Sequence, residues 1–190
     1  MNVIDISGWS EGLDWNAIAE NEDGVIIKIL EGRTIDSTFM DHFYSVQEKC
    51  MKWGVYCLSH AKTTERAIEE ADVVVDTLNG LGQPPLGIWF DVEPFLADAM
   101  DAEQLTAIAS AFISECNANG YSCGIYGNYA TLNKINCYDL ADYVPYWSAE
   151  PSSYQCDFKL ENPSLRVVGW QYEFDSKKYG GVCDLNEWWE

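Results

Sequence analysis

Residues 86–93 read Leu-Gly-Ile-Trp-Phe-Asp-Val-Glu, an apolar run that ends in two carboxylates. Its β-branched and aromatic residues predict a buried strand. Residues 63–80, before it, carry apolar side chains at helical spacing and end in an Asn-Gly helix stop. Residues 102–118, after it, follow Asp101, a residue that favours the helix N-cap. A buried strand between two such helices is typical of a parallel α/β sheet.

The same alternation extends in both directions along the chain. It implies an α/β fold, a small modified (β/α) barrel of about eight mostly parallel strands with about five helices, in one domain over residues 1–190. A doubly wound open sheet is the main alternative, but no GxGxxG or Walker motif follows the first strand. Other strands are predicted at residues 3–6, 24–30, 54–58, 123–126, 144–149, 165–172 and 182–185, and other helices from Asp14, over 38–53 and over 129–136.

The composition excludes several kinds of partner. The chain has 31 acidic and 11 basic residues, a formal net charge of −20. Such a surface repels phosphate backbones and anionic lipid, so neither nucleic-acid binding nor membrane docking is expected. No apolar run approaches the roughly 20 residues that span a bilayer, so membrane insertion is not expected.

Two features bear on the compartment. The N-terminus, Met1 to Asp5, leads directly into a predicted strand and lacks the basic and apolar regions of a signal peptide. We therefore expect either release without a signal, as through a holin, or an excised domain. The 7 cysteines include no CxxC pair and mostly lie among apolar residues, which predicts buried, reduced thiols.

Acidic residues end several of the predicted strands. Asp5, Glu31 and Asp184 close three of them, and Asp91 and Glu93 close the run described first. In a parallel barrel the C-terminal strand ends meet at one mouth, where reactive residues gather. We therefore expect these carboxylates to lie together.

The pair Asp91 and Glu93 is the sharpest chemical signal. Residues two apart on a strand point the same way, about 6–7 Å apart, as paired glycosidase carboxylates do. Crowded carboxylates raise each other's pKa, so one can hold a proton for a leaving oxygen. The alternatives are a strand end that simply meets solvent, or a metal site. With only His42 and His60 and no EF-hand spacing, the sequence predicts neither metal nor cofactor.

Aromatic residues are the second signal. The chain has 8 tryptophans and 11 tyrosines. Their apolar faces and polar tips suit the C–H faces and hydroxyls of sugars, although any one of them could instead fill the core. Those at or near predicted strand ends are Trp9, Tyr56, Tyr126, Trp147, Trp170 and Tyr172.

The motifs, in order, resemble glycoside hydrolase family 25, the phage-endolysin-type muramidases or lysozymes. The resemblance spans essentially the whole chain, and the order of the motifs is more specific than any one of them. They are VIDISGW at 3–9, LDW at 13–15, VIIKILEG at 25–32, WGVY at 53–56, FDVE at 90–93, GIY at 124–126, YWSA at 146–149, GWQY at 169–172 and VCDLN at 182–186.

The resemblance implies a barrel with five helices and three extra strands. It implies a peptidoglycan hydrolase that cleaves the β-1,4 bond between N-acetylmuramic acid and N-acetylglucosamine without a cofactor. Glu93 is then the general acid and Asp91 the assisting carboxylate, with Asp5 and Asp184 completing an acidic floor. The substrate-binding residues implied are Tyr56, Tyr126, Trp147, Gln171 and Glu31.

Some points stay open on the sequence. Cys57 stands where the family often has histidine, and Glu150 where it often has an aromatic residue. A non-catalytic module that binds cell-wall glycan is one alternative, and a chitinase-like or N-acetylglucosaminidase activity is another. The resemblance also allows a cell-wall-binding module in a longer parent protein.

Overall fold

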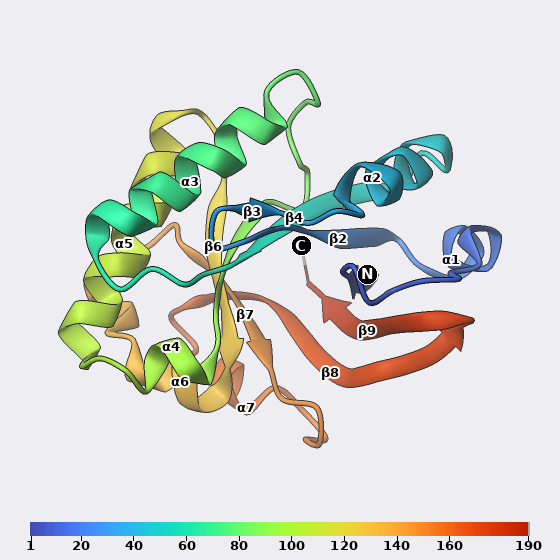
Figure 1. The fold of residues 1–190 in the computed structure, drawn as a ribbon. Coiled ribbons are helices and arrows are strands. Elements are labelled where there is room, and N and C mark those ends of the chain that lie inside the picture. The colour runs from blue at the N-terminus through green and yellow to red at the C-terminus, as the bar shows by residue number, and fades with distance from the viewer. Residues whose placement is uncertain (190) are drawn as a thin grey trace.

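The chain forms a closed barrel with helices around it (Figure 1). The computed structural model describes residues 1–189. Neighbouring strands follow the order β1-β9-β8-β7-β6-β5-β4-β2, and β1 also pairs with β2, which closes the ring. The barrel strands are β1 (Asn2–Ile6), β2 (Gly24–Glu31), β4 (Lys52–Leu58), β5 (Ile88–Val92), β6 (Cys123–Asn128), β7 (Pro145–Ala149), β8 (Arg166–Tyr179) and β9 (Gly181–Trp188); β3 (Thr34–Ile35) pairs with β2 outside the ring.

This topology confirms the predicted barrel and excludes the open sheet. From β1 through β2 and β4 to β8, each neighbouring pair is parallel. The exception is β9, which is antiparallel to both β8 and β1. All eight predicted strands are present. What the sequence did not reveal is that β8 and β9 form one long hairpin, turning at Gly180, whose φ is +89°.

The predicted helices lie outside the barrel, and shorter ones join them. Two of the short helices, α4 and α7, were not predicted, because four or five residues are too few to show a helical period. The helices are α1 (Trp15–Asn21), α2 (Phe39–Glu48), α3 (Thr64–Leu78), α4 (Pro94–Ala97), α5 (Ala102–Ala118), α6 (Tyr129–Lys134) and α7 (Asp157–Glu161), with a 3₁₀ helix at Cys137–Asp139.

Side-chain caps fix where the longer helices start. The Asp14 carboxylate accepts hydrogen bonds from the backbone N–H groups of Asn16 and Ala17, and Asp101 accepts one from Gln104 at 2.8 Å. Such a cap satisfies an N–H that the helix leaves unpaired. The starts of α1 and α5 therefore lie at the N-caps that the sequence predicts.

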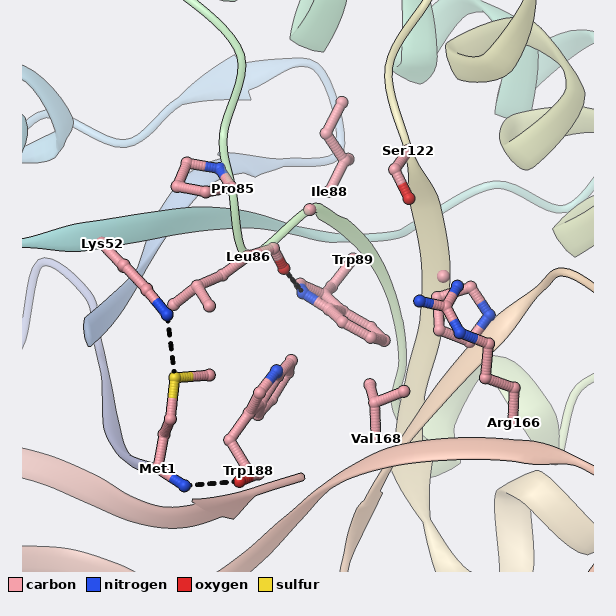
Figure 2. A pocket seen from close by; sticks show the side chains of 13 residues that line it. Met1, Lys52, Pro85, Leu86, Ile88, Trp89, Ser122, Arg166, Val168 and Trp188 are labelled. Carbon is pink, nitrogen blue, oxygen red and sulfur yellow. Dashed lines mark hydrogen bonds between the residues drawn. The ribbon is translucent and has the colours of Figure 1, made fainter. Parts of the chain in front are cut away.

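The barrel interior is apolar at one end and polar at the other. At the end of the barrel where β5 begins and the antiparallel β9 ends, Trp89 and Trp188 pack edge to face against each other and against Trp147 in the middle of β7, with ring centroids 5.3–5.7 Å apart. Trp188 thus closes this end of the barrel interior. Figure 2 shows this floor, where a pocket of about 180 Å³ lies beside Trp89, Trp188 and Lys52.

Two further findings concern composition. Within residues 1–189, none of the helices combines the length and the apolar character needed to cross a bilayer. All seven cysteines are free; six are buried as predicted, whereas Cys50 is exposed.

Candidate active site

Four of the predicted acids lie at the polar end of the barrel. Asp5 and Asp91 stand near the ends of β1 and β5, and Glu93 follows β5 directly as the first residue of the turn into α4. The prediction that Asp184 ends the last strand is wrong. Asp184 lies in the first half of β9, and because β9 runs antiparallel to β1, that half is at the same mouth, with Asp184 opposite Asp5.

These acids share one pocket with three of the predicted aromatic residues. The pocket has a volume of about 100 Å³. Within residues 1–189, no group of three or more His, Cys, Asp or Glu side chains is arranged to hold a metal ion. The residues that line the pocket are Asp5, Tyr56, Asp91, Glu93, Tyr126, Trp147 and Asp184.

Gln171 lies beneath the pocket, fully buried, and links its two sides. Its amide nitrogen donates to Asp5 at 2.8 Å and to Asp184 at 3.1 Å. Its amide oxygen accepts the hydroxyl of Tyr126 at 2.5 Å. Gln171 therefore positions both carboxylates and the tyrosine, although it does not itself line the pocket.

Asn186 also connects residues of the pocket, a role that the sequence analysis did not predict. Its amide nitrogen donates to Asp5 at 2.8 Å, and its oxygen accepts the indole N–H of Trp147 at 2.9 Å. The available signal was its position two residues after Asp184, which puts both side chains on the same face of β9.

Asp5 and Asp184 hold protons at unusually high pH. Burial, and then the neighbouring Asp184, raise the pKa of Asp5 to about 7, against the hydrogen bonds from Asn186 and Gln171. Burial raises the pKa of Asp184 to about 6, opposed by the backbone N–H of Asp175. Near neutral pH the pair therefore retains part of a proton.

Asp91 and Glu93 are also shifted toward the protonated form. Asp91 is 4% exposed, and burial followed by the charge of Glu93 raises its pKa well above the usual range. Desolvation alone raises the pKa of Glu93, which is half-buried. One oxygen of Asp91, Oδ1, is buried and has no hydrogen-bond partner. A buried acceptor left unpaired is costly, and such atoms are rare outside functional sites.

Lys28 is a buried cation beside the site that the sequence reading missed. Its ammonium lies 2.6 Å from Glu31 and acts against the raised pKa of Asp91. Residues three apart on a regular strand face opposite ways, but a bulge between Lys28 and Leu30 brings Lys28 and Glu31 to one side. A single basic residue within an apolar strand was the sequence signal.

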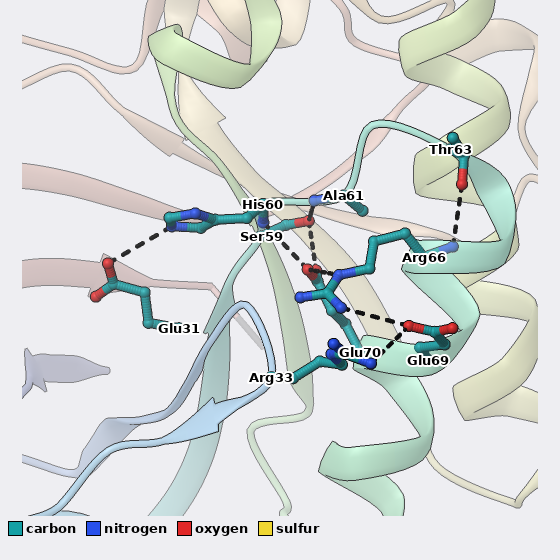
Figure 3. A network of polar contacts seen from close by, with 9 residues as sticks. All are labelled: Glu31, Arg33, Ser59, His60, Ala61, Thr63, Arg66, Glu69 and Glu70. Atoms are coloured by element: carbon teal, nitrogen blue, oxygen red, sulfur yellow. Dashed lines mark hydrogen bonds and ion pairs between the residues drawn. The ribbon is translucent and has the colours of Figure 1, made fainter.

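Glu31 is the one predicted site residue that lies apart from the others. Its half-exposed carboxylate lines a separate hollow of about 690 Å³ and is 3.5 Å from the ring of His60 (Figure 3). The loop that carries His60 is held by the buried Glu70, which accepts the Ser59 hydroxyl at 2.7 Å. Arg66 of α3 pairs with Glu70 at 3.3 Å and completes this network.

Cys57 and Glu150, the two residues that depart from the family pattern, both have structural roles. Cys57 is buried outside the barrel wall, in the core between strands and helices. Glu150 is buried, and its carboxylate accepts the Ser148 hydroxyl at 2.7 Å and the backbone N–H groups of Asp157 and Phe158. Glu150 therefore fixes the start of α7 and does not line the pocket with the acids.

Comparison with known proteins agrees with this geometry. The model of the glycosyl hydrolases family 25 matches residues 4–181. No curated protein sequence matches the chain. The solved structures that resemble it include the modular autolysin LytC of Streptococcus pneumoniae, at 21% identity and a TM-score of 0.82 over 99% of this chain and 46% of that one.

Two shorter solved structures match this chain over nearly the whole length of both proteins. The catalytic domain of endolysin ply40, from bacteriophage P40 of Listeria monocytogenes, is 20% identical with a TM-score of 0.79, over 100% of this chain and 93% of that one. The muramidase from Trichobolus zukalii is 20% identical with a TM-score of 0.79, and the match covers 100% of this chain and 94% of that one. The chain thus spans about half of the modular autolysin but nearly all of these two. With the family model matched over most of its length, the chain belongs to glycosyl hydrolases family 25 and is a glycoside hydrolase.

Proposed function

We propose that the chain hydrolyses peptidoglycan as an N-acetylmuramidase, a lysozyme that cleaves the β-1,4 bond between N-acetylmuramic acid and N-acetylglucosamine. Glu93 serves as the general acid and Asp91 as the assisting carboxylate. Asp5 and Asp184 form the acidic floor, with Tyr56, Tyr126 and Trp147 around the sugar.

One observation carries the proposal: Asp91 and Glu93 line one pocket together with three aromatic side chains. The substrate sugars carry an acetamido group, whose N–H is a hydrogen-bond donor. The carboxylate of Asp91 can accept this N–H from a sugar in the pocket, which would hold the sugar against Glu93.

Glu93 has the environment that a general acid needs. It is half-buried, and desolvation raises its pKa, so it retains a proton at higher pH than an exposed glutamate does. That proton goes to the glycosidic oxygen as the bond to C1 breaks. Positive charge develops on the ring, and the Asp91 carboxylate stabilises it. Two routes complete the reaction. Asp91 activates a water molecule that attacks C1, or Asp91 assists attack by the acetamido oxygen on C1, and water then opens the resulting oxazoline ring, so that in both routes the hydroxyl of water ends on C1.

The similar structures support this substrate. LytC was solved in complex with a synthetic peptidoglycan ligand, and the Trichobolus zukalii protein is described as a muramidase. On this proposal the chain acts on glycan strands outside the cell membrane. A longer parent with a cell-wall-binding module, as the modular LytC suggests, would bring the catalytic domain to the wall.

The test is Glu93→Gln, with Glu65→Gln as the matched control on the exposed face of α3. We expect Glu93→Gln to lower the rate of solubilisation of purified cell walls by about 10²–10⁴-fold, with an unchanged melting temperature, because general acid catalysis contributes about that factor. Glu65→Gln should behave as wild type. Wild-type lysis by folded Glu93→Gln protein would show that Glu93 is not the acid.

A further inference from the structure

A second hollow opens beside the pocket that holds the acids. Its volume is about 210 Å³, and it shares Asp5, Tyr56 and Asp184 with that pocket. Its outer wall adds Trp9, and Ser7 and Asp175 add polar groups. A ligand in the first pocket that extends past Asp184 therefore enters the second.

Trp9 is exposed in a way that the fold does not require. Its side chain is 85% exposed, and it is the only exposed one among the eight tryptophans, all of which the structure describes. An indole that packs against nothing contributes no burial energy to folding. Its large apolar face, next to a polar hollow, is instead available to a ligand.

The loop that carries Trp9 is held in place by several contacts. Gly8 N–H donates to Asp36 at 3.2 Å, and Ser10 N–H donates to the carbonyl of Ser7 at 2.9 Å. A ring nitrogen of His42, in α2, lies 3.3 Å from the same carbonyl. These contacts tie the backbone of the loop to the start of α2, so binding need order only the side chain of Trp9.

The second anchor of this loop is the β8–β9 hairpin. Asp14 N–H donates to the carbonyl of Tyr179 at 2.8 Å. A Cβ at Gly181 would lie 2.3 Å from the carbonyl oxygen of Glu11, so only glycine allows the hairpin and the loop to approach this closely. The wall that bears Trp9 and the wall that bears Asp184 are thus one connected unit.

The lining selects an uncharged sugar. The hollow carries three carboxyl groups, from Asp5, Asp175 and Asp184, and no cationic side chain lines it. These groups accept hydrogen bonds from hydroxyl and amide N–H groups. Asp175, the one carboxyl group of this hollow that does not line the first pocket, disfavours a sugar that carries the lactyl carboxylate of muramic acid or a peptide stem. An N-acetylglucosamine unit has the hydroxyls, the N–H and the neutral charge that fit.

We propose that this hollow is a distal subsite for a neutral pyranose of the N-acetylglucosamine type, whose C–H face stacks on Trp9. The proposal rests on the function proposed above and deepens it. The glycan strand extends from the carboxyl pair past Asp184 and ends against the indole.

The experiment measures binding of N-acetylglucosamine oligomers by calorimetry in the Glu93→Gln background, which prevents turnover. We expect Trp9→Ala to weaken binding of the longer oligomers by about tenfold, the factor for about 1.4 kcal/mol, within the range of a stacking contact. Trp9→Phe should recover most of the affinity. The matched control is Tyr44→Ala, an aromatic residue of α2 that is 62% exposed and lies outside the hollow.

Equal affinity of the Trp9→Ala and parent proteins would overturn the subsite, and so would a parent that binds no neutral oligomer. Failure of the proposed function appears separately: the wild-type protein would then release no muramic acid reducing ends from cell walls. A second readout is kinetic. Trp9→Ala should raise KM for soluble glycan strands about tenfold and change kcat little, since the indole lies away from the reacting bond.

Discussion

At the scale of single residues, the site depends on polar groups that burial leaves with few partners. Asp91 is shielded from water, has one unpaired oxygen and lies beside a second carboxyl. The opposing charge comes from Lys28, which is itself buried and paired with Glu31. The ionisation of Asp91 therefore depends on a cation in a neighbouring part of the barrel wall.

Lys28→Met should shift the acidic limb of the pH profile of kcat/KM to higher pH. A nearby cation lowers the pKa of a carboxyl, so its loss raises the pKa of Asp91, and the charged form then appears only at higher pH. Cell-wall hydrolysis across the pH range measures this. Lys52→Met, at the floor of the barrel, is the control. An acidic limb in the same place for Lys28→Met and wild type would contradict this role for Lys28.

At the scale of elements, the pairing of β1 with β9 places two acids opposite each other. Asp5 and Asp184 are cross-strand partners, and Gln171 and Asn186 donate to them. Like charges opposite each other in a sheet are destabilising. The barrel tolerates the pair because a proton remains there near neutral pH.

This arrangement predicts that stability falls as pH rises. Folded Asp5 has its pKa raised from 3.8 to about 7, so the folded state binds the proton more tightly than the unfolded state. The resulting stability is complete below about pH 4 and is lost as pH rises through about 7. The melting temperature should fall by at least about 2–4 °C between pH 5 and pH 8, the shift for about 1 kcal/mol in a domain of this size.

Asp5→Asn should flatten that dependence, whereas Asp76→Asn on the exposed face of α3 should leave it unchanged. Thermal unfolding at several pH values measures both. If Asp5→Asn kept the full wild-type slope, the high pKa of Asp5 would not be the cause.

The elements also show what the sequence could and could not predict. The strands were predictable because each is a short apolar run bounded by turn residues. The direction of β9 was not, because the mostly polar residues 173–178 hide the second half of β8, so the sequence does not show that β8 and β9 form one hairpin turning at Gly180. The carboxyl pair was found from its spacing. Asn186 was missed because its partners, Asp5 and Trp147, lie far away in the chain, as Asp91 does from Lys28.

At the scale of the whole molecule, the net charge of −20 opposes the proposed substrate. Bacterial walls are often anionic, so the surface of the protein repels them over distances comparable to the Debye length. The acids at the barrel mouth serve the proposed chemistry, but those along α3 do not.

Lytic activity on cell walls should therefore rise several-fold as ionic strength increases from about 0.01 M to 0.1 M, where the Debye length shortens from about 30 Å to 10 Å. A short soluble glycan fragment of peptidoglycan, which carries few charges, is the control substrate, and its hydrolysis should change little. Lytic activity that declines steadily from the lowest salt would contradict the repulsion.

If this barrel is a muramidase, the sugar at each new reducing end of digested peptidoglycan is N-acetylmuramic acid. Purified peptidoglycan is digested, the products are reduced with borohydride, and the reduced sugar is identified by mass spectrometry. We expect wild type to form reduced N-acetylmuramic acid and Glu93→Gln to form none. Reduced N-acetylglucosamine as the product would contradict the muramidase assignment.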